Sequence, residues 1–129
     1  MTGQGGSLLV GIDIVDIARL KNIIIRTPRF LERVFTAQEI AYCLQKKDPY
    51  PSLAARFAAR EAVRKLDRVF IEGIRFHDTE VAVDAEGKPR LILHAAARQG
   101  AEAADIRDFA ISLSHSREQA VAVVIAKKG

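Results

Sequence analysis

Two carboxylates and one lysine are the residues of this sequence best suited to chemistry. Asp13 interrupts an apolar stretch, where a carboxylate is costly unless it is paired, hydrogen-bonded or bound to a metal. Glu61 and Lys65 are four residues apart, so on a helix they share one face. With no zinc-type ligands nearby in the sequence, the carboxylates suit a hard ion such as Mg²⁺, which proteins bind through carboxylates and substrate phosphates. These residues therefore indicate a phosphate-handling site.

Each of these residues also has an explanation that needs no ligand. Asp13 would then cap the helix that follows it, and Glu61 with Lys65 would form a surface ion pair worth about 0.3–0.5 kcal/mol. The functional hypothesis adds that Ala54 and Ala58, earlier on the same helical face, leave room for a ligand in front of the pair. At the level of single residues both explanations stay open.

Three arginines and one histidine are further candidates. Arg56, Arg60 and Arg64 follow an adjoining stripe of the same helix. His115 ends a strand-like segment and is either a half-buried structural residue or a hydrogen-bond partner of a phosphate or ribose. The serines around His115 lack the Gly-x-Ser-x-Gly elbow, so we do not expect a serine hydrolase. The sequence also has neither a Walker A loop nor a Gly-x-Gly-x-x-Gly motif after a strand.

The composition limits the class of protein. With 129 residues, 49% of them hydrophobic, the chain is expected to form a single domain over 1–129, with 1–7 loosely ordered. The net charge of +4 favours either an anionic partner or simple solubility. The one cysteine, Cys43, excludes an intramolecular disulfide and indicates a reduced, cytoplasmic setting. No apolar run approaches the roughly 20 residues of a membrane helix, so no membrane partner is expected.

The start of the chain is expected to hold one strand and two helical segments. An apolar run predicts a buried strand over 8–12, which ends at Asp13. Asp16 is a candidate N-cap for a helix that reaches about Arg26. Pro28 begins another short helical piece.

Two further helices are expected before the middle of the chain. Thr36-Ala37-Gln38-Glu39 is a capping-box pattern, which predicts a helix over 37–45. A loop over 46–51 follows, because its two prolines prevent helix continuation. Ser52 is then the expected N-cap of the longest helix, over 53–66.

The second half is expected to be rich in strands. β-branched residues or period-two alternation predict strands over 74–83, 90–93, 109–115 and 120–126. A turn over 84–89 joins the first two, a short helix near 95–99 follows, and the last two form an antiparallel hairpin. The fold class is therefore α+β, with an antiparallel sheet packed against one long helix and shorter N-terminal helices.

Three segments in order carry a resemblance to a known family. They are 10–20 (VGIDIVDIARL), 55–65 (ARFAAREAVRK) and 111–116 (ISLSHS), the last followed by an alanine- and valine-rich strand. Phe35-Thr36-x-x-Glu39 and Gly87-Lys88-Pro89 fall between them in the expected order. From about Leu8 to Ala126, the chain resembles the holo-[acyl-carrier-protein] synthase family of phosphopantetheinyl transferases, short trimeric type.

The resemblance implies the phosphopantetheinyl transferase fold and a Mg²⁺-dependent transfer. The 4′-phosphopantetheine of coenzyme A would pass to a serine of an apo acyl carrier protein, with release of adenosine 3′,5′-bisphosphate. Asp13 and Glu61 would hold Mg²⁺ with the pyrophosphate, and Lys65 would assist departure of the leaving group. These three are the expected catalytic residues. Since the carrier supplies the attacking hydroxyl, the chain needs no nucleophile of its own.

The resemblance also implies binding residues and an assembly. The residues expected to contact coenzyme A are Lys47, Arg56, Arg60, Lys65 and His115. Those expected to dock the acidic carrier protein are Arg19, Arg29 and Phe30. The family's short members form homotrimers, with each site between neighbouring subunits.

The sequence departs from the family pattern at two places. Arg60 stands where the family usually has lysine before the metal-binding glutamate, which keeps the charge but changes the geometry. After Lys65, the family's glycine-rich stretch is replaced by Leu66-Asp67-Arg68-Val69-Phe70-Ile71. The alternative function is therefore a catalytically silent relative that binds coenzyme A or a carrier protein. A nucleic-acid-binding domain is disfavoured, because the few aromatic residues are not interleaved with the basic ones.

Overall fold

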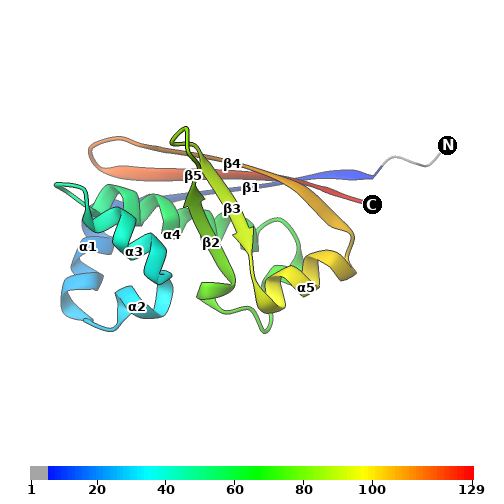
Figure 1. Ribbon diagram of the computed structural model, residues 1–129, viewed down its shortest axis with the longest axis horizontal. Coiled ribbons are helices and arrows are strands. Elements are labelled where there is room, and N and C mark those ends of the chain that lie inside the picture. Colours follow the sequence, from blue (N-terminus) through cyan, green and yellow to red (C-terminus); the bar gives the residue numbers. More distant parts are fainter. Residues whose placement is uncertain (1–5) are drawn as a thin grey trace.

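The computed structural model describes residues 6–129, and Figure 1 shows a long sheet with helices on one side of it. Loose order is expected for residues 1–7, and residues 1–5 of these lie outside the described part of the chain. Ser7 already belongs to a strand and pairs with Lys128. Among the described residues, none of the helices combines the length and apolarity needed to cross a membrane.

The main sheet is antiparallel and has the strand order β1-β5-β4. Its strands are β1 (Ser7–Asp16), β4 (Ile106–His115) and β5 (Gln119–Lys128). The expected hairpin of the last two strands is confirmed. The prediction that Asp13 ends the first strand is wrong: β5 pairs with β1 along its whole length, and Asp13 lies opposite Ala122.

The residues of β1 alternate between the two faces of the sheet, as period-two geometry requires. The exposed set points away from the helices and forms what we call the outer face: Leu8, Val10, Ile12 and Ile14. The opposite set is buried or half-buried and faces the long helix: Leu9, Gly11, Asp13 and Val15. Asp13 is thus directed to the helical side of the sheet.

The long helix α4 (Tyr50–Arg64) lies beneath the sheet (Figure 1). Its buried stripe is made of small and aliphatic residues: Leu53, Ala54, Ala55, Ala58, Ala59, Ala62 and Val63. The helix begins earlier than predicted, since Pro49 is the N-cap and Ser52 lies inside the helix. Pro51 is tolerated because N–H groups of the first helical turn have no intrahelical partner to lose.

The shorter N-terminal helices are α1 (Ile17–Arg26), α2 (Phe30–Val34) and α3 (Ala37–Leu44). Both cap predictions are confirmed. Asp16 accepts from the Arg19 N–H at 3.1 Å, and Thr36 and Glu39 form the reciprocal capping box. These helices cover one end of α4 around buried residues such as Phe35 and Leu53.

The second half adds a β-hairpin and a helix. The hairpin is β2 (Thr79–Val83) with β3 (Pro89–Leu93), followed by α5 (Ala95–Ala103), which is longer than expected. The strand predicted over 74–83 is shorter, because the Asp78 carboxylate accepts from the Arg75 N–H at 3.0 Å and closes a 3-10 turn there. The fold class is confirmed: one long helix and shorter N-terminal helices pack on an antiparallel sheet.

Candidate active site

The site begins where β1 and α4 touch, at Gly11 and Ala62. A Cβ added at Gly11 would lie 2.0 Å from the Ala62 carbonyl oxygen, far inside van der Waals contact. Only glycine therefore permits this approach. The contact places Asp13, two residues along the strand, beside the last turn of the helix.

Lys65 and Asp13 form an ion pair across this contact. The Lys65 ammonium, at the C-cap of α4, donates to Asp13 Oδ1 at 3.0 Å and to the Ile12 carbonyl at 2.9 Å. The Asp13 side chain is 19% exposed and that of Lys65 is 55% exposed. The carboxylate is therefore partly screened from water, whereas the lysine can turn toward a ligand.

Glu61 lies one helical turn before Lys65 on the same face of α4. Its side chain is 34% exposed, and its nearest cationic atom is Arg64 Nε at 3.9 Å. This distance is too long for a hydrogen bond. Within the described residues no hydrogen bond reaches the carboxylate, so it remains available to a ligand.

A groove of about 480 Å³ lies beside the middle of α4, next to the second half of β1. Its lining residues come from β1, α1, α2, α4 and β5: Asp13, Ile14, Val15, Asp16, Arg19, Leu20, Ile23, Phe30, Phe57 and Gln119. Phe57 is four residues before Glu61, so Glu61 and Lys65 continue the face of α4 on which Phe57 lies. Asp13 is therefore the predicted metal ligand that lines the groove itself, and Glu61 lies one helical turn beyond Phe57 on α4.

The residues that precede Glu61 on its face of α4 differ from those predicted. Ala54 and Ala58 are fully buried in the core, so the prediction that they leave room for a ligand is wrong. Phe57 is the residue that precedes Glu61 on its exposed face, and it lines the groove. The exposed face of α4 that contains Glu61 thus includes Phe57 in place of Ala54 and Ala58.

The chemistry of the donors fits a hard divalent cation. Asp13 and Glu61 offer carboxylate oxygens, and the Ile12 carbonyl accepts from the same Lys65 ammonium as Asp13. Within the described residues no three His, Cys, Asp or Glu side chains are grouped as a metal site. An ion here would depend on ligand phosphates and water for its other contacts, which suits Mg²⁺.

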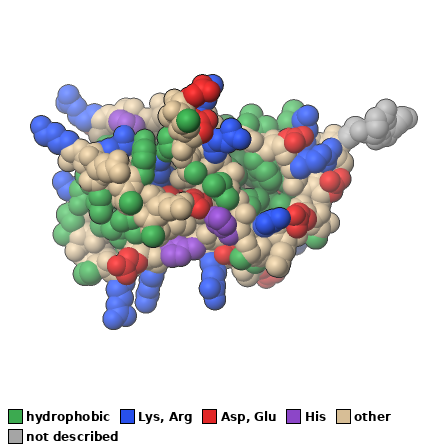
Figure 2. Space-filling view, in the orientation of Figure 1, with side chains coloured by type: hydrophobic (Ala, Val, Ile, Leu, Met, Phe, Trp, Pro, Cys, Tyr) green, Lys and Arg blue, Asp and Glu red, His purple; other side chains and the backbone are tan. Residues whose placement is uncertain are grey.

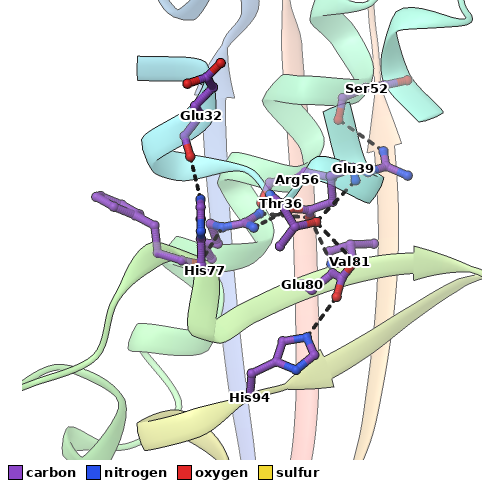
Figure 3. A network of polar contacts seen from close by, with 11 residues as sticks. Glu32, Thr36, Glu39, Ser52, Arg56, His77, Glu80, Val81 and His94 are labelled. Atoms are coloured by element: carbon purple, nitrogen blue, oxygen red, sulfur yellow. Dashed lines mark hydrogen bonds and ion pairs between the residues drawn. The ribbon is translucent and has the colours of Figure 1, made fainter. Parts of the chain in front are cut away.

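Arg60 is directed away from this stripe and into the protein. It is 3% exposed. Its guanidinium donates to Glu39 through two nitrogens, one of them Nη1 at 3.0 Å from Oε2, and its Nε donates to the Phe76 carbonyl at 3.0 Å. Figure 3 shows the polar network around Glu39, the acceptor of two of these bonds.

Arg56 is also buried. Its guanidinium lies 4.8 Å from the centre of the Tyr42 ring, and Nη1 donates to the Ser52 carbonyl at 3.2 Å. Among the described residues its Nε finds no hydrogen-bond partner. One donor of Arg56 is thus left unused.

His115 and Lys47 lie apart from Asp13 and Lys65. His115 is exposed at the end of β4 and lines a hollow of about 350 Å³ with Ile14 and Val121 of the sheet. Lys47 is exposed in the loop between α3 and α4. No contact within residues 6–129 joins either of them to the Asp13–Lys65 pair.

The residues predicted to dock a carrier protein divide between the groove and its rim. Arg19 and Phe30 line the groove, and Arg29 is exposed at the start of α2. The Phe30 ring lies 6.1 Å from that of Phe57, which lies 6.4 Å from that of Phe76. An aromatic row thus crosses α4 beside the groove.

The segment after Lys65 is held firmly without glycines. Leu66 and Phe70 are buried in the core. Asp67 accepts from Lys128 Nζ at 2.7 Å and from the Val69 N–H at 3.1 Å. The bond from Lys128, followed by that from Val69, lowers the pKa of the Asp67 carboxyl.

Cys43 is the only cysteine, and it is fully buried in α3. Burial raises the pKa of its thiol, so the thiol stays protonated at neutral pH. A protonated, inaccessible thiol is no nucleophile. The described part of the chain thus offers no cysteine for covalent chemistry.

Comparison with known proteins defines the class of enzyme. The family model described as the 4′-phosphopantetheinyl transferase superfamily matches residues 9–124. The chain is 45% identical to the holo-[acyl-carrier-protein] synthase of Moorella thermoacetica over 120 residues, 93% of this chain and 94% of that protein. The synthase of Alkaliphilus metalliredigens is 41% identical over 117 residues, 91% and 96% of the two chains. The chain belongs to this superfamily and, within it, to the holo-[acyl-carrier-protein] synthase enzymes.

Solved structures agree with this assignment. A complex of a Chronobacterium ammoniagenes synthase with coenzyme A superposes with a TM-score of 0.83 at 27% identity, covering 95% of this chain and 98% of that one. The Helicobacter pylori synthase in complex with coenzyme A gives a TM-score of 0.75 at 28% identity, with 92% and 99% covered. The fold of this chain is therefore that of the synthases.

Proposed function

We propose that this protein transfers 4′-phosphopantetheine from coenzyme A to a serine of an apo acyl carrier protein in a Mg²⁺-dependent reaction that releases adenosine 3′,5′-bisphosphate. The observation that carries the proposal is the ion pair between Asp13 and Lys65 at the contact between β1 and α4, with Glu61 one helical turn before Lys65 on the same face. Relatives named for this reaction, two of them solved with coenzyme A, support it. Because the one cysteine needs no oxidising compartment, a cytoplasmic setting belongs to the same proposal.

Asp13 and Glu61 are the proposed ligands of Mg²⁺. When bound, the ion would neutralise phosphate charge and polarise the phosphorus–oxygen bonds. The two carboxylates come from different elements, so their separation depends on how closely β1 packs on α4 at Gly11. The fold thus sets the width of the binding site.

Lys65 is proposed to stabilise the leaving group. Its ammonium is bonded to Asp13 at 3.0 Å, yet its side chain is 55% exposed. A positive charge placed beside a departing bisphosphate lowers the cost of the charge that develops there. The ammonium would therefore exchange a carboxylate partner for a phosphate partner.

Arg56, Lys47 and His115 are proposed contacts of coenzyme A. The exposed ammonium of Lys47 is suited to phosphate oxygens. Arg56 rests on the family resemblance alone, because its unused Nε is buried and a phosphate could reach it only after the side chain had moved. His115 is exposed beside a hollow large enough for part of a nucleotide. The prediction that Arg60 contacts coenzyme A is not supported by its position, because Arg60 is buried and paired with Glu39.

The groove and its rim are proposed to dock the carrier protein. Phe30 offers an apolar contact in the groove, while Arg19 and Arg29 offer charges that complement an acidic partner. Figure 2 shows further basic side chains projecting from the end of the molecule formed by α1 to α3. Complementary charge accelerates encounter and fixes orientation.

The outer face of the sheet supports assembly into a homotrimer. Leu8 is 72% exposed and Val10 is 62% exposed, and Ile12, Ile14 and Ile125 of the same face are also exposed. Contiguous apolar patches of this kind mark protein interfaces. His115 lies at the end of this face, beside Ile14, so a neighbouring copy packed there would meet the proposed nucleotide contact.

A mass measurement tests the proposal. The protein is incubated with coenzyme A, Mg²⁺ and an apo carrier protein, and the carrier is then weighed by mass spectrometry. We expect a mass gain of one phosphopantetheine that disappears when EDTA is present. A carrier that stays unmodified while coenzyme A still binds would instead identify a catalytically silent relative.

A further inference from the structure

We infer that the buried Glu39–Arg60 pair is a positioning device, which fixes the rotation of α4 about its axis and so the direction in which Glu61 points. The inference rests on the proposed function, because it assigns a role toward the metal ligand Glu61. Neither Glu39 nor Arg60 touches the groove. Both act through the helix.

Glu39 joins three elements through one carboxylate. It accepts from the Thr36 N–H at 2.9 Å at the start of α3, from the Val81 N–H at 2.9 Å in β2, and from two nitrogens of Arg60 in α4. Figure 3 shows Glu39 between Thr36 and Val81. With every acceptor direction in use, the carboxylate has little freedom to move.

The Arg60 side chain is also held by several contacts. Its guanidinium donates to Glu39 through two nitrogens and to the Phe76 carbonyl through Nε at 3.0 Å. Its Cζ atom also lies 5.2 Å from the centre of the Phe35 ring. A guanidinium can satisfy all these partners at once, whereas a lysine ammonium cannot reproduce the planar fork.

The anchors of α4 flank Glu61 in the sequence. Arg60 ties the helix to α3 and β2, and Ala62 lies against Gly11 of β1. Consecutive residues point about 100° apart around a helix. Glu61 therefore projects between two fixed directions, and the helix cannot roll without breaking one of the two contacts.

A neighbouring contact holds Glu39 in its place. The buried Glu80 carboxylate accepts from the Thr36 hydroxyl at 3.1 Å and lies 2.8 Å from His94 Nε2. Thr36 in turn donates its backbone N–H to Glu39. The start of α3 is thus attached to β2 at two points, Val81 and Glu80.

The magnitude of the effect follows from helix geometry. With side chains, a helix has a radius of about 5–6 Å, so a roll of about 10° moves a carboxylate by about 1 Å. A misplacement of about 1 Å from a remote mutation can cost on the order of 100-fold in rate. Buried ion pairs contribute specificity of structure in some proteins more than they contribute stability. In this protein the pair would specify the direction in which the Glu61 side chain points.

The test compares Arg60→Lys with a control matched in thermal stability. The control is Ile106→Val or Ile106→Ala, whichever gives the same melting temperature as Arg60→Lys. Ile106 is buried in β4 and does not line the groove. Mn²⁺ binding in the presence of coenzyme A is measured by calorimetry, together with the Mg²⁺ dependence of transfer and the KM for the carrier.

We expect Arg60→Lys to weaken metal binding about tenfold, the lower end of the effect of residues that support metal ligands. The KM for the carrier should stay unchanged, and the control should bind Mn²⁺ as the wild type does. If Arg60→Lys and its control bind Mn²⁺ equally, the positioning role is wrong. If that happens while the wild type transfers phosphopantetheine, only the positioning role fails and the proposed function stands. If the wild type itself is inactive, the proposed function is refuted.

A double variant covers the case in which Arg60→Lys does not fold. Glu39→Gln with Arg60→Met removes both charges, so no unpaired charge is left in the core. We expect this protein to fold, to lose metal affinity about tenfold as well, and to show faster amide exchange in the last turn of α4. Wild-type metal affinity in a folded double variant would overturn the inference.

Discussion

The Lys65 ammonium lies 3.0 Å from Asp13 Oδ1, joining the end of α4 to the middle of β1 across 52 residues of sequence. The pair links two separate elements and brings the ammonium next to the carboxylate. Because Lys65 is more exposed than Asp13, the lysine is the partner that can move. The carboxylate would then be free for a cation while the ammonium meets a phosphate.

Replacement of Glu61 by alanine should abolish transfer without unfolding the protein. Loss of a metal ligand is expected to lower kcat by at least about 100-fold, the order found when one contact to a developing charge is removed. The side chain is one-third exposed and accepts no hydrogen bond within residues 6–129, so the free energy of unfolding should change by no more than about 0.5 kcal/mol. Turnover by mass spectrometry and urea titration measure the two effects. Turnover at the wild-type rate would remove Glu61 from the metal site.

Gly11→Ala should reduce both stability and activity. The new methyl group would lie 2.0 Å from the Ala62 carbonyl oxygen, so β1 and α4 must move apart. Overpacking of this kind costs about 1–3 kcal/mol, and separation of Asp13 from Glu61 should weaken binding of Mg²⁺. Calorimetric melting and a Mn²⁺ titration check the two parts.

Gly100→Ala is the matched control for that variant. Gly100 lies inside α5, and a Cβ there would meet Val69 at ordinary distances of 3.5 Å or more. Alanine in a helix is favoured over glycine by about 0.5–1 kcal/mol, so this protein should be more stable than the wild type. Equal effects of the two substitutions would show that the close contact at Gly11 has no special role.

A charge on the outer face should dissociate the proposed trimer. Val10→Asp places a carboxylate in the middle of the exposed apolar surface of β1, where a neighbouring copy would bury it. Sedimentation should give the mass of a trimer for the wild type and of a monomer for the variant. Leu44→Asp, a similar change at the exposed end of α3, is the control and should leave the mass unchanged. A monomeric wild type would refute the assembly.

Local sequence signals predicted the elements well but not their ends. The capping box at Thr36 and Glu39 and the cap at Asp16 depend on neighbours within three residues, and both are present. The full length of β1 could not be predicted, because it depends on pairing with β5 more than 100 residues away. The start of α4 was misplaced because a proline is compatible with both a loop and a first helical turn.

The site was predictable only in part for a similar reason. Asp13 and Lys65 were found by their residue types, and the structure brings them together. Gly11 and Phe57 were missed, although the four-residue spacing from Phe57 to Glu61 was a usable signal. The family resemblance assigns Arg60 to the ligand, because a match of local segments cannot reveal that a distant glutamate, here Glu39, pairs with it.

The ion pair between Asp67 and Lys128 should make stability depend on pH in the acid range. The pKa of Asp67 is lowered in the folded protein from an ordinary value near 3.8, chiefly by the bond from Lys128. The folded state therefore binds the proton less readily than the unfolded state. The contribution of the ion pair to the free energy of unfolding is fully present at pH values above the ordinary pKa of Asp67. It is lost as the pH falls through the lowered pKa that Asp67 has in the folded protein.

Asp67→Asn should accordingly be less stable than the wild type at pH 7, by up to about 1 kcal/mol for a partly exposed pair. The difference should shrink below about pH 4 and vanish once Asp67 is protonated in the folded wild type. Urea titrations of both proteins from pH 2 to pH 7 measure it. Asp105→Asn, which removes the exposed pair with Arg107, is the control and should change stability little at any pH. If the Asp67 variant differed from the wild type by the same amount at every pH, the ion pair with Lys128 would not be the cause of the change.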